Sequence, residues 1–256
     1  MSTYVISDIH GNSKAWEAIK EQIKLGNEDE LYILGDVIDR GEGGIAILQE
    51  IMNTPNMHML LGNHELMMLN ALGLSYTPQD GENYFSKNNR KWLWMRNGGK
   101  VTLDCYKSQS ELEKTRIQNY LKALPLSMYV IVNGVEYIMV HANWERLYDM
   151  VASAIPERRT SFCVWDRENL EKLVAVVDYT NESGRPTEVV VGHTPTLYFD
   201  ERGDEFPIDE QFLSVYKNGH LIAMDCGAGW GDEYDGKKGR LACLRLDDMK
   251  AFYSES

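Results

Sequence analysis

Three short β-rich runs alternate with helical segments over the first 72 residues, and this alternation constrains the fold more than any other feature. The strands are predicted at residues 3–7, 30–36 and 57–63, and the helices at 13–25, 43–54 and 64–72. In the first helical segment Trp16, Ile19 and Ile23 recur at intervals of three and four, which is typical of a buried helix face, and Ser13 is the expected N-cap. Strands separated by helices are typical of βαβ units, so we predict a parallel sheet.

Residues 73–125 interrupt this alternation. Two segments, at 84–99 and 108–124, have helical patterns with no strand between them. We therefore predict that 73–125 form a helical insertion. No repeat, low-complexity tract or polar linker marks a domain boundary, so a single domain is expected over residues 1–256.

The strand pattern returns after this insertion. Asn133-Gly134 separates two apolar runs within 128–143, which is a strong hairpin signal, and a further strand is predicted at 187–195. We predict a late antiparallel pair from residues 220–227 and 240–248. The chain is thus expected to be a mixed α/β domain, with parallel strands first and antiparallel strands later.

Charge and hydropathy exclude several classes of partner. The net charge of −13 disfavours sequence-independent binding to the nucleic-acid backbone. No apolar run approaches the roughly 20 residues of a membrane helix. Asp8 and His10 interrupt the first apolar run too early for a signal peptide. We therefore expect a cytoplasmic protein without nucleic-acid or membrane partners, and its oligomeric state stays open.

Side chains that can bind metal follow five of the predicted strands, at the carboxyl end of each. They are Asp8 and His10 after the first strand, Asp36 after the second, Asn63 after the third, and His141 and His193 after two later strands. Ligands bind at the carboxyl edge of an open α/β sheet. Five strand ends that each deliver such a side chain to one edge predict a metal site there.

The residue types of this set indicate which metals it would hold. Carboxylate, imidazole and amide donors without thiolate suit Mn, Fe, Zn or Co. Six candidates are too many for one tetrahedral ion with an open position, and they suit two ions that share a carboxylate. The four cysteines form no C-x-x-C pair and are expected to be buried thiols; they are Cys105, Cys163, Cys226 and Cys243.

Five short motifs, in order along the chain, resemble the signature of the calcineurin-like metallophosphoesterases. They are D-I-H at 8–10, G-D-V-I-D-R-G at 35–41, G-N-H-E at 62–65, V-H-A-N at 140–143 and G-H-T-P at 192–195. The second and third resemble the phosphoprotein phosphatase branch. H-A-N together with V-W-D-R-E-N at 164–169 is most similar to the bacteriophage-lambda-type and bacterial serine/threonine phosphatases. The resemblance implies a β-sandwich of two mixed sheets flanked by helices, in α-β-β-α layers.

The resemblance also implies a ligand set. Asp8, His10 and Asp36 would bind one metal, and Asp36 would bridge to a second that is completed by Asn63, His141 and His193. Two divalent or trivalent ions are implied, with manganese expected and iron, zinc, cobalt or nickel as alternatives. A hydroxide between the ions would attack phosphorus directly, without a covalent phosphoenzyme.

Four further residues receive roles from the same resemblance. His64 would be the general acid, and Asp39 would accept a hydrogen bond from it and favour the imidazolium form. Arg40 and Arg167 would bind the phosphate oxygens.

Alternative roles for several of these residues stay open. Asp39 can instead cap the helix that begins near Gly43. Arg158 and Arg159 compete with Arg167 as the second phosphate ligand. For Glu65 a structural role at the start of its helix is preferred.

The expected activity is hydrolysis of phosphate monoesters, on phosphoserine or phosphothreonine proteins, with phosphotyrosine proteins and small phosphoesters as further substrates. The main alternative is hydrolysis of dinucleoside polyphosphates, which close relatives with similar motifs perform. Those relatives tend to lose the aspartate of the D-R-G block, whereas this chain keeps Asp39. A catalytically silent metal-binding scaffold and a phosphodiesterase are weaker alternatives, since no expected ligand is missing and no basic stripe is present.

Overall fold

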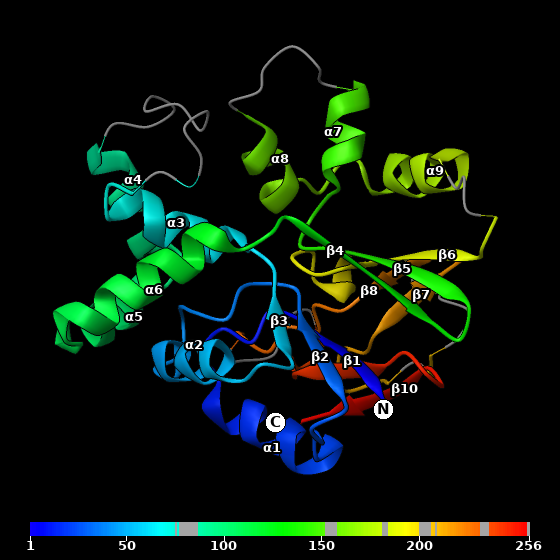
Figure 1. The fold of residues 1–256 in the computed structure, drawn as a ribbon, viewed down its shortest axis with the longest axis horizontal. Helices are drawn as coiled ribbons and strands as arrows, with labels where there is room; N and C mark the ends of the chain where they lie inside the picture. The colour runs from blue at the N-terminus through cyan, green and yellow to red at the C-terminus, as the bar shows by residue number, and fades with distance from the viewer. Residues whose placement is uncertain are drawn as a thin grey trace.

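Two mixed β-sheets form the centre of the molecule (Figure 1). The structure is a computed structural model that describes residues 1–74, 76, 87–151, 158–180, 184–199, 206–207, 209–230 and 236–254. Within this part of the chain the first sheet has the strand order β10-β9-β1-β2-β3, and the second β4-β5-β6-β8-β7. The α/β sandwich expected from the sequence is confirmed.

The first sheet contains the predicted parallel strands. β1, β2 and β3 run parallel, and β9 and β10 add an antiparallel edge beside β1. Their bounds are Thr3–Ile6, Glu30–Ile33 and Met57–Met59 for β1 to β3, and Ala242–Arg245 and Lys250–Tyr253 for β9 and β10.

The second sheet is also mixed. β5, β6 and β8 run parallel, and the antiparallel strands β4 and β7 form its edges. Their bounds are Ser127–Val132 for β4, Val135–Val140 for β5, Thr187–Val191 for β6, Tyr216–Asn218 for β7 and Leu221–Ala223 for β8. The predicted hairpin joins β4 to β5. Asn133 and Gly134 both have positive φ, as a two-residue type I′ turn requires.

The predicted pairing of residues 220–227 with 240–248 is wrong. β8 lies in the second sheet beside β6, whereas β9 lies in the first sheet beside β1. Both segments have the expected strand character, but the sheet that each one joins depends on contacts with distant strands. β8 also runs parallel to β6, so the late strands are not uniformly antiparallel.

Alternate residues of the inner strands, such as β1 and β5, enter different cores, which explains their continuous apolar runs in the sequence. In β1, Tyr4 and Ile6 pack toward helices, whereas Val5 faces the second sheet. In β5, Met139 faces the first sheet, whereas Val140 packs toward helices. A strand that is buried on both faces needs apolar side chains at every position. One face of these strands is covered by the other sheet, and the opposite face is covered by helices.

Helices cover the outer face of each sheet (Figure 1). α1 (Ser13–Ile23), α2 (Gly44–Asn53) and α3 (Asn63–Ala71) pack against the first sheet. α7 (Glu145–Val151), α8 (Arg159–Trp165) and α9 (Leu170–Thr180) follow β5, and the short 3-10 turn η2 (Thr196–Tyr198) follows β6. The N-cap of α1 is Asn12 rather than the predicted Ser13, since the Asn12 side chain accepts a hydrogen bond from the Ala15 N–H at 3.0 Å.

Three helices occupy the described part of the predicted insertion, where the sequence indicated two. They are α4 (Lys87–Arg96), α5 (Gly99–Ser108) and α6 (Glu111–Ala123). Residues 77–86 of this predicted insertion lie outside the described residues. α5 was missed because Gly98-Gly99 indicates a helix end, and a new helix begins directly at Gly99.

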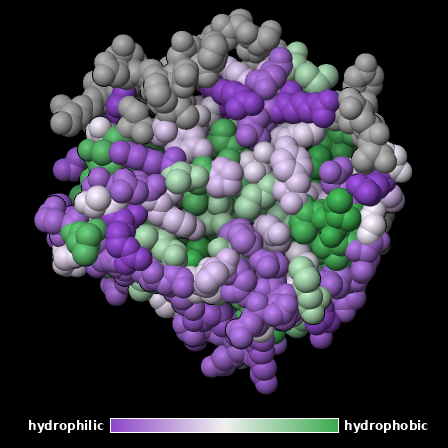
Figure 2. All heavy atoms as spheres, in the orientation of Figure 1, coloured by the Kyte–Doolittle hydropathy of each residue, from purple (hydrophilic) through white to green (hydrophobic). Residues whose placement is uncertain are grey.

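None of the described helices is long and apolar enough to cross a bilayer. Figure 2 shows hydrophilic side chains over much of one face, with separate apolar patches between them.

Candidate metal centre

The loops that leave β1 and β2 run side by side and are joined by backbone hydrogen bonds. The Asp8 N–H donates to the Gly35 carbonyl at 3.2 Å, and the His10 N–H donates to the Asp36 carbonyl at 2.9 Å. β1 and β2 are parallel neighbours, so both loops emerge at the same edge of the sheet. Asp8, His10 and Asp36 are thereby brought together, as the strand pattern predicted.

The second sheet delivers its polar residues to the same edge. His141 Nε2 lies 3.0 Å from Asn63 Oδ1, and the His193 N–H donates to Asp8 Oδ2 at 3.0 Å. His141 and His193 follow β5 and β6 of the second sheet, whereas Asp8 follows β1 and Asn63 follows β3 of the first. The strand ends of both sheets therefore meet at one site.

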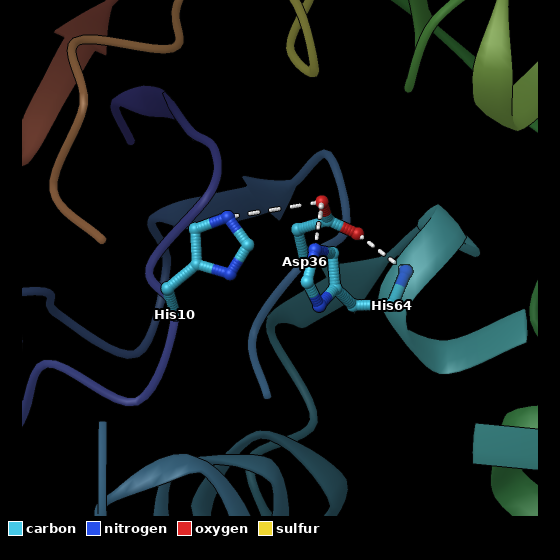
Figure 3. Close-up of side chains that lie close together, drawn as sticks. All are labelled: His10, Asp36 and His64. Atoms are coloured by element: carbon cyan, nitrogen blue, oxygen red, sulfur yellow. Dashed lines mark hydrogen bonds and ion pairs between the residues drawn. The ribbon is translucent and has the colours of Figure 1, made fainter. Parts of the chain in front are cut away.

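Asp36 occupies the centre of this site. Figure 3 shows its carboxylate between the side chains of His10 and His64. Asp36 Oδ2 lies 3.8 Å from His10 Nε2 and 3.9 Å from His64 Nε2. Asp36 Oδ1 faces the other way, 3.6 Å from His141 Nε2. One carboxylate thus reaches two separate sets of imidazoles.

Two groups of buried side chains in the described part of the chain have the spacing of a metal site. One is His10, Asp36 and His64, and the other is Asp36, His141 and His193, with the ligand atoms of each group within 4.8 Å of one another. Asp36 belongs to both groups, which is the arrangement that two ions sharing a carboxylate need. The donors are oxygen and nitrogen without sulfur, so the residues fit hard or borderline divalent ions.

Asp8 and Asn63 extend these two groups. Asp8 Oδ1 lies 3.9 Å from His10 Nε2, and Asn63 Oδ1 lies beside His141. The sequence assigned His64 to acid catalysis, yet its Nε2 also lies within reach of a metal in the first group.

Burial sets the protonation of the cluster. It raises the pKa of the Asp36 carboxyl well above its ordinary value, and the neighbouring carboxylates of Asp8 and Glu65 raise it further. Burial also lowers the pKa of the histidines around it, which favours the neutral imidazole that binds metal. These histidines are His10, His141 and His193.

Backbone strain concentrates in the same residues. Nine described non-glycine residues have positive φ, and six of them are candidate site residues: Asp8, His10, Asp36, Asp39, Arg40 and His193. Such conformations cost of order 1–3 kcal/mol each and persist only where the surroundings enforce them. The turns after the strands are therefore bent in the way that directs these side chains toward one another.

His64 and Asp39 form a buried hydrogen-bonded pair. His64 Nδ1 lies 2.7 Å from Asp39 Oδ2, and Arg40 Nη2 lies 3.4 Å from His64 Nε2. Asp39 therefore does not cap α2, whose N-cap is Gly43. Burial lowers the pKa of His64 well below its ordinary value, and the positive charge of Arg40 lowers it further. The expected imidazolium is thus disfavoured in the metal-free site, because desolvation and the charge of Arg40 both favour the neutral ring.

Arg167 lies at the mouth of the site, whereas Arg159 does not. The exposed Arg167 donates from Nε to His193 Nε2 at 3.2 Å and from Nη2 to the His193 carbonyl at 3.1 Å. Arg159 instead pairs with Asp149, with both nitrogen–oxygen distances at 3.0 Å. A pocket of about 290 Å³ adjoins Arg167, lined also by Leu170, Thr194, Tyr198 and Phe199.

A family model described as calcineurin-like phosphoesterase matches residues 1–223. The chain belongs to this family. Together with the two buried His/Asp groups, the match makes it a metal-dependent phosphoesterase. The match covers all six candidate metal ligands of the phosphoesterase.

Curated relatives of this phosphoesterase have two kinds of name. A symmetrical bis(5'-nucleosyl)-tetraphosphatase from Buchnera aphidicola is 23% identical over 100% of this chain and 99% of its own length. Serine/threonine-protein phosphatase 2 from Salmonella typhimurium is 29% identical over 55% of this chain and 58% of its own. A further symmetrical tetraphosphatase, from Haemophilus ducreyi, is 36% identical, but the match spans only 27% of that protein and 28% of this chain.

A solved structure supports the fold of the phosphoesterase. A serine/threonine phosphatase from Saccharomyces cerevisiae superposes with a TM-score of 0.58, over 100% of this chain and 80% of that one, at 13% identity. At this identity the likeness bears on the fold alone.

Sequence reasoning understated the part played by Glu65. This carboxylate is fully buried and accepts hydrogen bonds from four backbone N–H groups, of Asp36, Val37, Ile38 and Gly62, at 2.9–3.3 Å. It does stand in the first turn of α3, as expected. It also holds the turn that directs Asp36 into the site, and nothing in the local sequence pattern indicates that second contact.

Asp225 was missed altogether. It is buried, its pKa is raised well above the ordinary value by burial and by Asp8, and it accepts a hydrogen bond from the Gly227 N–H at 2.9 Å. Asp225 directly follows an apolar run, so the signal that identified Asp36 was present here too.

Replacing Glu65 by Gln is expected to destabilise the fold. The amide NH₂ of Gln would face two of the four N–H groups and leave them unpaired, which costs about 2 kcal/mol in the free energy of unfolding. Urea unfolding measures the change. The exposed Glu28→Gln is the control and should change stability by less than about 0.5 kcal/mol. Equal stability of Glu65→Gln and the wild type would contradict this account of the turn.

Replacing Gly229 by Ala is expected to weaken metal binding. A Cβ atom on Gly229 would lie 2.5 Å from His10 Cδ2, so the imidazole or the loop must move. Displaced ligands typically cost 10–100-fold in metal affinity, and we expect roughly tenfold here. Isothermal titration with Mn²⁺ measures it. Gly26→Ala, where the nearest atom is a flexible Asp29 oxygen at 3.2 Å, should bind as the wild type does.

Proposed function

We propose that this phosphoesterase hydrolyses phosphate monoesters, with phosphoserine and phosphothreonine proteins as its substrate class. The observation that carries the proposal is the buried His64–Asp39 pair beside the shared carboxylate of Asp36. Together these groups offer a proton donor next to a place where two cations can bind. Hydrolysis of a monoester needs both, because charge develops on the phosphoryl oxygens while the leaving oxygen takes up a proton.

The proposed metal ligands follow the two groups of donors. Asp8, His10 and Asp36 would hold one ion, and Asp36, Asn63, His141 and His193 the other. When bound, two such ions acidify a water molecule and neutralise charge on the phosphoryl group. Manganese is the proposed metal, since the mixed oxygen and nitrogen donors suit it.

His64 acts as the proton donor in this proposal. Its Nδ1 is bonded to Asp39, so its Nε2 is the atom that meets the leaving oxygen. Burial and Arg40 lower the pKa of His64 in the free protein. An arriving phosphate dianion brings negative charge beside Nε2 and engages Arg40, and both changes favour a proton on Nε2. Arg40 and Arg167, both exposed at the site, are placed to bind phosphate oxygens with planar, paired N–H groups.

Hydrolysis of dinucleoside polyphosphates is the second candidate, and the full-length similarity to the Buchnera tetraphosphatase favours it. The retained Asp39 and its bond to His64 favour the monoesterase, because an ester with a basic leaving oxygen depends on a well-held proton donor. Phosphoric anhydrides have a weakly basic leaving group and depend on it less.

A parallel substrate assay distinguishes these two functions. Purified protein with Mn²⁺ is given a phosphoserine peptide, a phosphotyrosine peptide, 4-nitrophenyl phosphate and diadenosine tetraphosphate. We expect the phosphoserine peptide and 4-nitrophenyl phosphate to be cleaved. Cleavage of the tetraphosphate alone would replace the first candidate by the second, and no cleavage with any divalent metal would refute both.

The Asp36→Asn variant tests the shared carboxylate. Asn presents one neutral oxygen in place of two charged ones, so both ions lose a ligand and the number bound per chain should fall well below that of the wild type. Mass spectrometry of the bound metal measures this number. Asp104→Asn, at an exposed pair with Lys100, should keep the full complement. Loss of one ion with the other kept would show that Asp36 is not shared.

A further inference from the structure

Helices α4 and α5 contact the loop that carries Asp39 and Arg40 at three points. The Trp94 indole N–H donates to the Asp39 carboxylate, 3.0 Å from Oδ1 and 2.9 Å from Oδ2. The Asp39 N–H donates to the Thr102 hydroxyl at 2.9 Å, and the Arg40 N–H donates to the Gly98 carbonyl at 3.1 Å. The side chain of Asp39 and the backbone of both residues are thus tied to the helical segment.

The contact with Trp94 is buried on both sides. Asp39 is 0% and Trp94 1% exposed, so water cannot replace the indole N–H as a donor. The carboxylate has three partners: Oδ2 lies 2.7 Å from His64 Nδ1, the indole N–H is shared between Oδ1 and Oδ2, and the Thr102 hydroxyl is a further side-chain partner. A carboxylate held by a single partner can rotate about its Cβ–Cγ bond. With the indole on the other side, its plane and its direction toward His64 are fixed.

We infer that Trp94 is a positioning residue for the proton donor. Its indole N–H orients the Asp39 carboxylate, and Asp39 in turn holds His64 so that Nε2 points at the leaving oxygen. This inference rests on the proposed function, in which His64 donates the proton. Trp94 touches neither metal ligand nor substrate in this account and acts only through Asp39. The helical segment is thereby part of the catalytic apparatus, and not only a packing element.

Packing is the competing explanation, because Trp94 lies in the same hydrophobic cluster as α3 and α5, and its ring covers Gly99. The two explanations differ in what the N–H contributes. Trp94→Phe keeps an aromatic ring in the core and removes the donor. A second variant, with β-(3-benzothienyl)-alanine at position 94, keeps both rings and replaces only the N–H by sulfur, so it serves where Trp94→Phe fails to fold.

A matched control exists elsewhere in the chain. Trp16 is also 1% exposed, and its indole N–H donates to Glu50 Oε2 at 2.8 Å, away from the metal centre. Trp16→Phe therefore removes an indole–carboxylate bond from an equally buried indole, with the difference that the Glu50 side chain is 35% exposed. Any general effect of losing an indole–carboxylate bond appears in this control.

The decisive measurement is the dependence of kcat on the leaving group. Phenyl phosphate releases a basic oxygen that needs a proton, whereas 4-nitrophenyl phosphate releases a weakly basic one. For Trp94→Phe we expect kcat to fall roughly tenfold with phenyl phosphate and less than about twofold with 4-nitrophenyl phosphate. The tenfold loss is smaller than the whole contribution of a general acid, because His64 is still present. Trp16→Phe should leave both values unchanged. Equal losses on both substrates, or none, with Trp94→Phe would overturn the inference.

A second readout does not depend on activity. In protein loaded with diamagnetic Zn²⁺, the proton between His64 Nδ1 and Asp39 is expected to give a downfield NMR signal that His64→Asn removes, which assigns it. In Trp94→Phe and in the benzothienyl variant this signal should shift and exchange faster with water, whereas Trp16→Phe should keep it. An unchanged signal would refute the positioning role. A wild-type protein that cleaves no substrate would refute the proposed function, and the NMR signal would still decide whether Trp94 holds the pair.

Discussion

The buried carboxylate of Asp36 is the constraint on which the rest of the site depends. A charge at this depth is costly unless it is paired or bound to metal, yet its neighbours are imidazoles that burial keeps neutral. One backbone amide binds it instead: the His64 N–H donates to Asp36 Oδ1 at 2.9 Å, and Glu65 accepts from the Asp36 N–H and holds the turn. Burial and the carboxylates of Asp8 and Glu65 disfavour the ionised form of Asp36 unless a positive charge is bound beside it. Cations fill such a site better than any side chain can.

The strained turns at the site are stable because they support one another. Asp8 and His10 follow β1, Asp36 follows β2, and the backbone bonds between these loops fix both at once. Each turn has a residue in the left-handed region whose cost the opposite loop offsets. Since parallel neighbouring strands leave the sheet at the same edge, this cross-linking follows from the topology. The order of the strands in the sheet therefore helps to fix the positions of the candidate ligands.

Local patterns predicted those parts of the molecule that depend on local chemistry. The strand–helix alternation, the Asn133-Gly134 hairpin and the polar residues after each strand all rest on neighbours in the chain. The missed features rest on distant contacts. The bond of Trp94 to Asp39 joins residues 55 positions apart, and the sheets that accept β8 and β9 are set by β6 and β1. Asp225 is the exception, because it directly follows an apolar run and its local pattern is similar to that of Asp36.

The candidate site divides into buried and exposed groups, and the relatives of this chain carry two kinds of enzyme name. The candidate metal ligands are all buried, at 0–3% exposed, and contact one another more than they contact solvent. Such residues determine that a phosphorus–oxygen bond is cleaved, but they do not reach the rest of the substrate. Arg167 and Tyr198 are exposed beside the pocket that adjoins the site. Side chains at this outer rim can therefore differ without disturbing the buried carboxylate of Asp36.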